Sequence, residues 1–262
     1  MKQFSKLIGL LLFCTSMLQT KAAIKEEVIT YKVGEKTMKG VIVYNDANKK
    51  KAPAVLIVHE WWGRTQYPIM RAHMLADMGY VAFCVDMYGE GKTVDNVADA
   101  QKLSGEVYSN PAVLKERFMA AYEVVAKQPT VDKSKIAAIG YCFGGTVVLN
   151  AATMGVPLVG VVSFHGGLAG IKANKETLKA KILVCHGGAD TFISEEDVVN
   201  FKKQMDGAAA NYEFKVYEGC THAFTNPTST DTGKKLGLPI AYNEVADKAS
   251  WNDMKAFLKK VF

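Results

Sequence analysis

Arginine is the scarcest charged residue in this chain: only three of its 32 basic residues are arginine, namely Arg64, Arg71 and Arg117. Cysteine is also rare, and no spacing among the five cysteines resembles a zinc site. No basic run is interleaved with aromatic residues, which excludes the usual pattern of a nucleic-acid-binding protein. Repeats, low-complexity tracts and an interdomain linker are missing, so the 262 residues fit one domain. We expect no metal ion, no cofactor and no nucleic-acid partner.

A membrane-spanning run is missing as well, because the most apolar segment, LIGLLLFCTSML, covers only residues 7–18. Lys2 and Lys6 precede it, and the small residues Thr20 and Ala22 follow it. This order of charge, apolar run and small residues is typical of a secretory signal. We therefore predict that residues 1–22 are removed and that residues 23–262 are periplasmic or secreted, without a membrane span. Removal of three lysines and no acids lowers the formal net charge from +6 to +3.

Four cysteines remain after this removal: Cys84, Cys142, Cys185 and Cys220. Four cysteines can pair in an oxidising compartment, and that alternative stays open. Cys84 and Cys185, however, lie inside the strand-like runs VAFCVD and ILVCHG, where a thiol behaves as a small apolar side chain. We expect these two residues to be buried free thiols.

Short apolar runs alternate along the chain with segments of helical periodicity. The runs cover residues 54–60, 80–86, 135–141, 158–166, 181–187 and 213–219, and the helical segments include 68–79, 111–128, 194–205 and 244–262. This alternation predicts a mostly parallel α/β sheet with helices on both faces. Two alternating segments before it, 27–34 and 37–44, predict an N-terminal antiparallel hairpin. In such a sheet, the chemistry belongs at the carboxyl ends of the strands.

The segment GYCFGG, residues 140–145, has the Gly-x-nucleophile-x-Gly pattern of a nucleophile elbow, with Cys142 where serine is more common. It follows a strand-like run and precedes the helix-like TVVLNAATMG. Glycines are needed there because the strand and helix backbones approach closely. The residue at the apex lies at a helix N-terminus, where the helix dipole favours a thiolate. We therefore predict that Cys142 is a nucleophile rather than a structural thiol.

A thiol at an elbow needs a base and a group that orients the base. In this architecture the chain order is nucleophile, acid and histidine. Asp190 follows a strand-like run in HGGAD, and His222, the only histidine after Asp190, follows the next one in CTHAF. We predict that His222 takes the thiol proton and that Asp190 orients the imidazole and stabilises its charged form. His165 ends another strand-like run and is a candidate pocket residue.

The segment HEWWG follows the first run of the predicted parallel sheet. The loop at this place and the residue after the nucleophile each provide one oxyanion N–H in this architecture. Trp61 and Phe143 are therefore the candidate oxyanion residues, through their backbones. Glu60 places a carboxylate beside two tryptophans at the expected mouth of the site. It is either an exposed loop acid or a partner that tunes the thiol.

Five motifs together, HEWWG, GYVAFCVDMYG, GYCFGG, HGGAD and CTHAF, resemble the dienelactone hydrolases from about residue 26 to the C-terminus. The resemblance implies an α/β-hydrolase fold and Cys-Asp-His catalysis on ester or lactone bonds, with a thioester acyl-enzyme. It also implies that Glu60 holds the resting thiol and takes part in activating it when substrate displaces the carboxylate.

The substrate contacts of that family differ in this chain. Dienelactone hydrolases bind the substrate carboxylate with two arginines, and the matching positions here hold Glu90 and Asn226. Arg64 is the one arginine expected near the mouth, and Trp62 and Tyr88 are further pocket candidates. Because a bidentate guanidinium holds a carboxylate best, we expect neutral short-chain esters to be preferred over carboxylates.

Two other functions stay open: a true carboxymethylenebutenolidase, and a non-catalytic binding protein on the same fold. For an enzyme, the partner is a small-molecule ester or lactone. Nothing in the sequence indicates an oligomer, and we expect a monomer. The segment 222–245 forms either part of a lid or a solvated surface loop.

Overall fold

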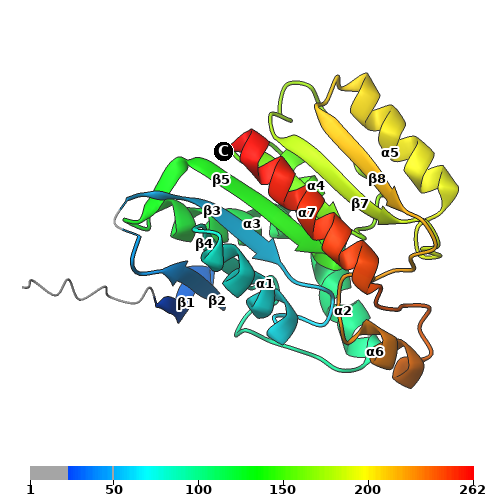
Figure 1. Cartoon of the computed structure of the whole chain (residues 1–262), viewed down its shortest axis with the longest axis horizontal. Coiled ribbons are helices and arrows are strands. Elements are labelled where there is room, and N and C mark those ends of the chain that lie inside the picture. The colour runs from blue at the N-terminus through cyan, green and yellow to red at the C-terminus, as the bar shows by residue number, and fades with distance from the viewer. Residues whose placement is uncertain (1–22, 49) are drawn as a thin grey trace, which may run out of the picture.

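The chain folds around an eight-stranded sheet in the order β1-β2-β4-β3-β5-β6-β7-β8 (Figure 1). The computed structural model describes residues 23–48 and 50–262, so the predicted signal segment lies outside the described residues. The strands are β1 (Ile24–Val33), β2 (Lys36–Asn45), β3 (Ala52–Val58), β4 (Val81–Val85), β5 (Val131–Tyr141), β6 (Gly160–Phe164), β7 (Lys181–Gly187) and β8 (Tyr212–Tyr217). β1 and β2 form an antiparallel hairpin, and β2 also pairs with β4 in antiparallel orientation. All the other strand pairs are parallel. The predicted α/β-hydrolase architecture is confirmed.

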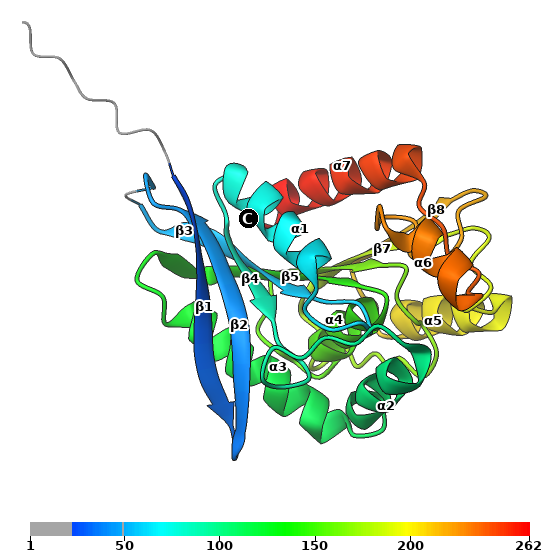
Figure 2. The ribbon, with the colours of Figure 1, turned by 90° about the horizontal axis from the view of Figure 1, so that it is seen from below.

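Helices cover both faces of the sheet. They are α1 (Gln66–Asp77), α2 (Val97–Tyr108), α3 (Pro111–Ala126), α4 (Phe143–Thr153), α5 (Glu195–Gly207), α6 (Ser229–Leu236) and α7 (Glu244–Val261). Figure 2 shows α1 and α7 on one face and α3, α4 and α5 on the other. No helix in the described part of the chain is long and apolar enough to cross a membrane.

The two layers of helices explain why the strand-like runs are apolar without alternation. Leu56 and Val58 of β3 face a core that includes Phe118 of α3. Val55 and Ile57, on the opposite face, belong to a second core with helix α1. Each central strand therefore buries both of its faces, as the strands of a parallel sheet do.

The predicted buried thiols lie in these cores. Cys84 of β4 and Cys185 of β7 are buried and free, and burial raises the pKa of both thiols. Cys220 is also buried and free. The described part of the chain therefore holds its cysteines as separate thiols.

Polar side chains at the helix starts account for several of the boundaries. Asn96, Asn110, Ser194 and Asn243 each accept a hydrogen bond from a backbone N–H in the first turn of α2, α3, α5 and α7. Such caps satisfy donors that have no partner inside the helix. The sequence pattern does not predict helix α6. Its eight residues lie inside the segment 222–245, for which the sequence leaves a lid or a surface loop open. It ends at Gly237, whose left-handed conformation suits glycine.

The turn between β5 and α4 is the tightest feature of the fold. Cys142 stands between strand and helix with a φ of 52°, in a region that side chains rarely adopt. A Cβ on Gly144 would lie 2.2 Å from the carbonyl oxygen of Val58, and one on Gly140 would lie 2.0 Å from the carbonyl oxygen of Gly144. Only glycine fits at these two positions, because the obstructing atoms belong to the backbone.

We predict that Gly144→Ala lowers the free energy of unfolding by at least about 2 kcal/mol, because helix and strand must separate to admit the methyl group. Gly105→Ala is the matched control: this glycine lies inside α2 with nothing within 4 Å of an added Cβ. It should stabilise the protein by up to about 1 kcal/mol through helix propensity. Thermal unfolding measures both changes. An unfolding temperature for Gly144→Ala equal to that of the unsubstituted protein would contradict the close approach.

Candidate active site

Four of the predicted site residues lie at one edge of the sheet, just after strands end. Glu60 follows β3, Cys142 follows β5, Asp190 follows β7 and His222 follows β8. These strands are neighbours or near neighbours in the parallel part of the sheet, so their carboxyl ends meet there. In residues 23–48 and 50–262, no three His, Cys, Asp or Glu side chains are grouped as a metal ion would require.

Cys142 is held through its backbone. Its N–H donates to the carbonyl oxygen of Phe164 at 3.0 Å and to Nδ1 of His165 at 3.1 Å. Phe164 ends β6, the strand next to β5, so the neighbouring strand fixes the apex of the elbow. The thiol is partly exposed and faces a cavity. A fixed backbone under an accessible sulfur is the arrangement that a nucleophile needs.

His222 and Asp190 are joined directly. His222 Nδ1–H donates to Asp190 Oδ2 at 2.7 Å, and the other carboxylate oxygen accepts from the N–H of Phe192 at 2.9 Å. Burial disfavours the imidazolium, but negative charge at Cys142 and the hydrogen bond to Asp190 outweigh it and raise the pKa of His222 to about 10. The His222 imidazole in this position therefore holds a proton more firmly than a free imidazole does.

His165 differs from its expected place as a pocket residue. Its side chain is fully buried and lines neither cavity of the site. Because Nδ1 accepts from the Cys142 N–H, Nε2 carries the proton and donates to Thr225 Oγ1 at 2.8 Å. Burial also holds the pKa of His165 well below its ordinary value, so the ring is neutral. The ring turns toward the backbone of the elbow and supports Cys142 from beneath.

Glu60 is a buried acid rather than an exposed loop residue, with 3% of its surface accessible. Its Oε2 accepts a hydrogen bond from Asn226 Nδ2 at 2.6 Å. Burial raises the pKa of Glu60 to about 7, although Asn226, His222 and Arg71 each favour the ionised form. This carboxyl group therefore changes its charge close to neutral pH.

The peptide between Glu60 and Trp61 is fixed on its carbonyl side. The Glu60 carbonyl oxygen accepts from His59 Nδ1 at 2.6 Å and from the N–H of Gly63 at 3.1 Å. The peptide is trans, so the Trp61 N–H points away from these contacts. Tyr88 donates its hydroxyl to the Trp61 carbonyl oxygen at 3.0 Å. Tyr88, an expected pocket residue, lines neither cavity and instead holds this loop from behind.

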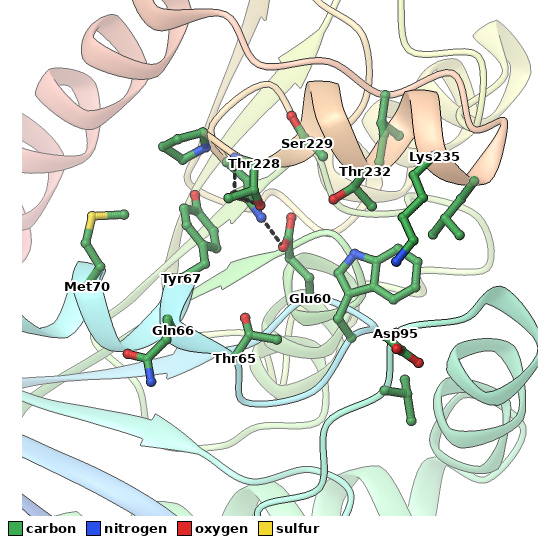
Figure 3. A pocket seen from close by; sticks show the side chains of 17 residues that line it. Glu60, Thr65, Gln66, Tyr67, Met70, Asp95, Thr228, Ser229, Thr232 and Lys235 are labelled. Atoms are coloured by element: carbon green, nitrogen blue, oxygen red, sulfur yellow. Dashed lines mark hydrogen bonds between the residues drawn. The ribbon is translucent and has the colours of Figure 1, made fainter.

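Two adjoining cavities lie over these groups. The smaller one, of about 260 Å³, is lined by Cys142 and His222, and aromatic side chains form a large part of its wall. Its other lining residues are Glu60, Trp61, Trp62, Tyr108, Phe143, Gly167, Phe192, Ile193, Ala223 and Ile240. The larger one, of about 530 Å³, lies beyond Glu60 and below α6 (Figure 3). Both share Glu60, Trp62, Ala223 and Ile240, so the predicted pocket residue Trp62 lies in the wall of each.

Arg64, which we expected near the mouth, and Glu90, at one family arginine position, both lie away from the cavities. Arg64 lines neither cavity, because its guanidinium packs against Gly91. Glu90 is exposed and pairs with Lys39 at 2.6 Å, away from both cavities. Asn226, at the other position where dienelactone hydrolases have an arginine, does line the larger cavity. No arginine lines either cavity, so neither presents a guanidinium.

Several residues of the site were missed in the sequence. His59 directly precedes Glu60 in HEWWG, and that adjacency to a predicted loop was an available signal. Thr225 and Asn226 lie close behind His222 in sequence, but nothing in the pattern indicates what their side chains contact. Tyr108 and Phe192 come from two distant segments and meet only in the wall of the smaller cavity.

Known proteins resemble this chain over most of its length. Residues 38–262 match the model of the dienelactone hydrolase family. A putative carboxymethylenebutenolidase of Aquifex aeolicus is 32% identical over 189 residues, which cover 70% of this chain and 81% of that protein. Protein usf of Aquifex pyrophilus is 29% identical over 214 residues, which cover 79% of this chain and 88% of that protein.

Solved structures of dienelactone hydrolase-like proteins share this fold. The crystal structure of a dienelactone hydrolase-like promiscuous phosphotriesterase from metagenomic libraries superimposes with a TM-score of 0.85. The two proteins are 28% identical, and the match covers 92% of this chain and 99% of that one. The chain therefore belongs to the dienelactone hydrolase family of the α/β-hydrolase superfamily, whose members hydrolyse ester or lactone bonds, and it is a hydrolase of this kind.

Proposed function

We propose that the chain is an exported hydrolase of neutral esters or lactones that uses Cys142, His222 and Asp190 as a catalytic triad. One observation carries this proposal: the Cys142 thiol and the His222 ring line one cavity, while His222 is bound to Asp190 at 2.7 Å. A nucleophile, a base and a group that orients the base are the three parts of covalent acyl transfer.

In the first half of the proposed cycle, His222 Nε2 takes the thiol proton and the sulfur attacks the carbonyl carbon of the substrate. The negative charge that develops on the carbonyl oxygen accepts hydrogen bonds from the N–H groups of Trp61 and Phe143. The carbon–oxygen bond to the leaving alcohol then breaks, and the alkoxide takes the proton from His222. A thioester on Cys142 and a free alcohol result.

In the second half, water replaces the alcohol. His222 takes a proton from this water, and the resulting hydroxide attacks the thioester carbonyl through the same oxyanion contacts. The carbon–sulfur bond breaks, Cys142 regains its proton from His222, and the carboxylic acid leaves. Asp190 orients and stabilises the imidazolium in both halves.

We propose that Glu60 holds and releases a proton beside the Cys142 thiol. It lines the same cavity as Cys142, and its pKa of about 7 lets it exist in both charge states near neutral pH. The resemblance to dienelactone hydrolases implies that the matching glutamate holds the resting thiol. In this structure its carboxyl group is bound to Asn226.

A true carboxymethylenebutenolidase is the second candidate, because relatives carry that name. Its substrate bears a carboxylate, and the two positions that bind this group in the family hold Glu90 and Asn226 here. Glu90 lies outside both cavities, and Asn226 is already bound to Glu60. These contacts favour a neutral substrate. A binding protein without catalysis is disfavoured, because it would not need the nucleophile, base and acid to be assembled.

Export is proposed on the sequence of residues 1–22, with a mature protein that begins near Ala23. N-terminal sequencing of the protein recovered outside the cytosol tests it, and Leu11→Arg, which interrupts the apolar run, is the control that should leave the precursor uncleaved. A protein that retains Met1 in the cytosolic fraction would contradict export.

We predict that Cys142→Ala lowers kcat on a short neutral ester by at least about 10³-fold, because the acyl group has no acceptor. Cys220→Ala is the control, since Cys220 is a thiol two residues from His222 that lines neither cavity. The control should stay within about threefold of the unsubstituted rate, far from the loss expected at a catalytic residue. Initial rates on p-nitrophenyl acetate measure both. Full activity in Cys142→Ala would refute the triad.

We also predict that a neutral ester is preferred over a matched carboxylate, and that the preference grows as pH rises. Above a pH of about 7, Glu60 loses its proton, and its negative charge then repels an anionic substrate in a partly dry site. The ratio of kcat/KM for the methyl amide of p-nitrophenyl hemisuccinate to that for the hemisuccinate itself should increase about tenfold between pH 6 and pH 9. Glu60→Gln should make the ratio independent of pH. A preference for the anion at pH 9 would contradict the prediction.

A further inference from the structure

The larger cavity has no role in the steps above. At about 530 Å³ it is twice the size of the cavity that holds Cys142 and His222, and it lies within the usual range of ligand sites. The two cavities share Glu60, Trp62, Ala223 and Ile240, so a ligand that reaches the thiol can extend past Glu60 into the larger one.

Unpartnered polar groups stand around this cavity. The side chains of Thr65, Gln66, Ser229 and Thr232 line it, and none of them has a hydrogen-bond partner among the residues that the structure describes. The Ser229 hydroxyl oxygen is buried away from the open space of the cavity. Figure 3 shows Thr65 and Thr232 on either side of Glu60. Thr65 and Thr232 are partly exposed and Gln66 is exposed, so their polar groups are free to bind a ligand that brings its own donors and acceptors.

Apolar side chains form another part of the wall. Trp62, Leu236 and Ile240 lie on it together with the ring of Tyr67. The Tyr67 hydroxyl is already bound to Thr225 at 2.6 Å, so this residue presents mainly its ring. An occupant therefore needs both an apolar body and several polar atoms.

The charges around the cavity do not favour an anion. Lys235 and Asp95 line it with opposite charges, and both are exposed. Glu60, which lines both cavities, is buried. The two acids outnumber the one lysine, so an anionic occupant is repelled, whereas a neutral occupant is not.

Each cavity can hold one half of an ester, either the acyl group or the alcohol. The acyl group stays bonded to Cys142 until water arrives, and so it belongs to the smaller cavity, where the thiol lies. The alcohol must leave before water can attack. The larger cavity is partly walled by the exposed residues Gln66, Met70 and Lys235, which gives the alcohol a way out.

We propose that the larger cavity binds the alcohol part of the substrate, and that this alcohol is a neutral polyhydroxy compound about the size of a single sugar ring. The natural substrate is then a short-chain acyl ester of such an alcohol. This inference rests on the proposed function and adds the identity of the leaving group to it.

A series of four esters tests the inference, with release of acid as the measurement. They are the 6-O-acetyl ester of a monosaccharide, cyclohexylmethyl acetate, methyl acetate and methyl octanoate. We expect kcat/KM for the sugar ester to exceed that for each of the other three by at least about tenfold, since two added hydrogen bonds are worth that much. If kcat/KM for cyclohexylmethyl acetate is higher than for the sugar ester, the larger cavity is an apolar site. If kcat/KM for methyl octanoate is higher than for the sugar ester, the larger cavity binds the acyl group. Either result would overturn the proposal.

Thr232→Trp tests the location, because it fills the larger cavity from α6. We expect the ratio of kcat/KM for the sugar ester to that for methyl acetate to fall at least about tenfold, from the same loss of contacts. Lys234→Trp is the matched control: it lies on the same helix, is exposed and lines neither cavity, so the ratio should not change. An unchanged ratio in Thr232→Trp, in a protein that still folds by circular dichroism, would overturn the location.

The experiment separates this inference from the proposed function. If none of the four esters is hydrolysed by the unsubstituted protein, the proposed function fails and the inference with it. If methyl acetate is hydrolysed at a rate equal to or above that of the sugar ester, the proposed function stands and the inference alone fails.

Discussion

The contact between the first turn of α4 and the end of β3 fixes Cys142 relative to the loop that carries Glu60 and Trp61. At Gly144 the helix backbone lies so close to Val58 that an added Cβ would be 2.2 Å from its carbonyl oxygen. This approach brings the Phe143 N–H and the Cys142 thiol beside the loop that carries Glu60 and Trp61. A side chain between the two backbones would separate Cys142 from the loop that carries Trp61, and the proposed mechanism needs the two close together. The geometry of the site is thus a consequence of backbone packing.

A chain of buried hydrogen bonds links that contact to the loop that carries His222. The Cys142 N–H donates to His165, and His165 donates to Thr225, which is three residues beyond His222. The Thr225 carbonyl oxygen in turn accepts from Arg71, whose guanidinium also pairs with Asp247 of α7. The position of His222 relative to the thiol therefore depends on α1, which carries Arg71, and on α7, which carries Asp247. A neutral His165 suits this role, because it must accept at one nitrogen and donate at the other.

The sequence predicted the sheet, the tight turn around Cys142 and the positions of Asp190 and His222 after their strands, because each depends on local patterns. Apolar runs mark buried strands, glycines mark the tight turn around Cys142, and the chain order of acid and histidine is set by the fold. Side-chain direction is not local. His165 and Arg64 come after strands that end near the site, yet packing turns one beneath the elbow and the other against Gly91. Helix α6 lacked a signal because it is short.

The contact between Glu60 and Asn226 shows most clearly what a sequence does not contain. The two residues are 166 positions apart, and only the folded chain brings them to 2.6 Å. An arginine at position 226 would keep Glu60 ionised, whereas the neutral amide leaves its pKa near 7. One substitution relative to the family pattern thus changes the charge of the site without changing its fold. The larger cavity then opens beside this carboxyl group.

The central claim is that Cys142 carries the acyl group between the two halves of the reaction. Acid quenching during steady-state turnover of p-nitrophenyl acetate, followed by mass spectrometry of the intact protein and of its peptides, tests it directly. The account predicts one acetyl group per chain, located on the peptide that contains Cys142 and labile to hydroxylamine as a thioester is. Turnover with the acetyl group on another residue, or with an unmodified Cys142 throughout, would contradict it.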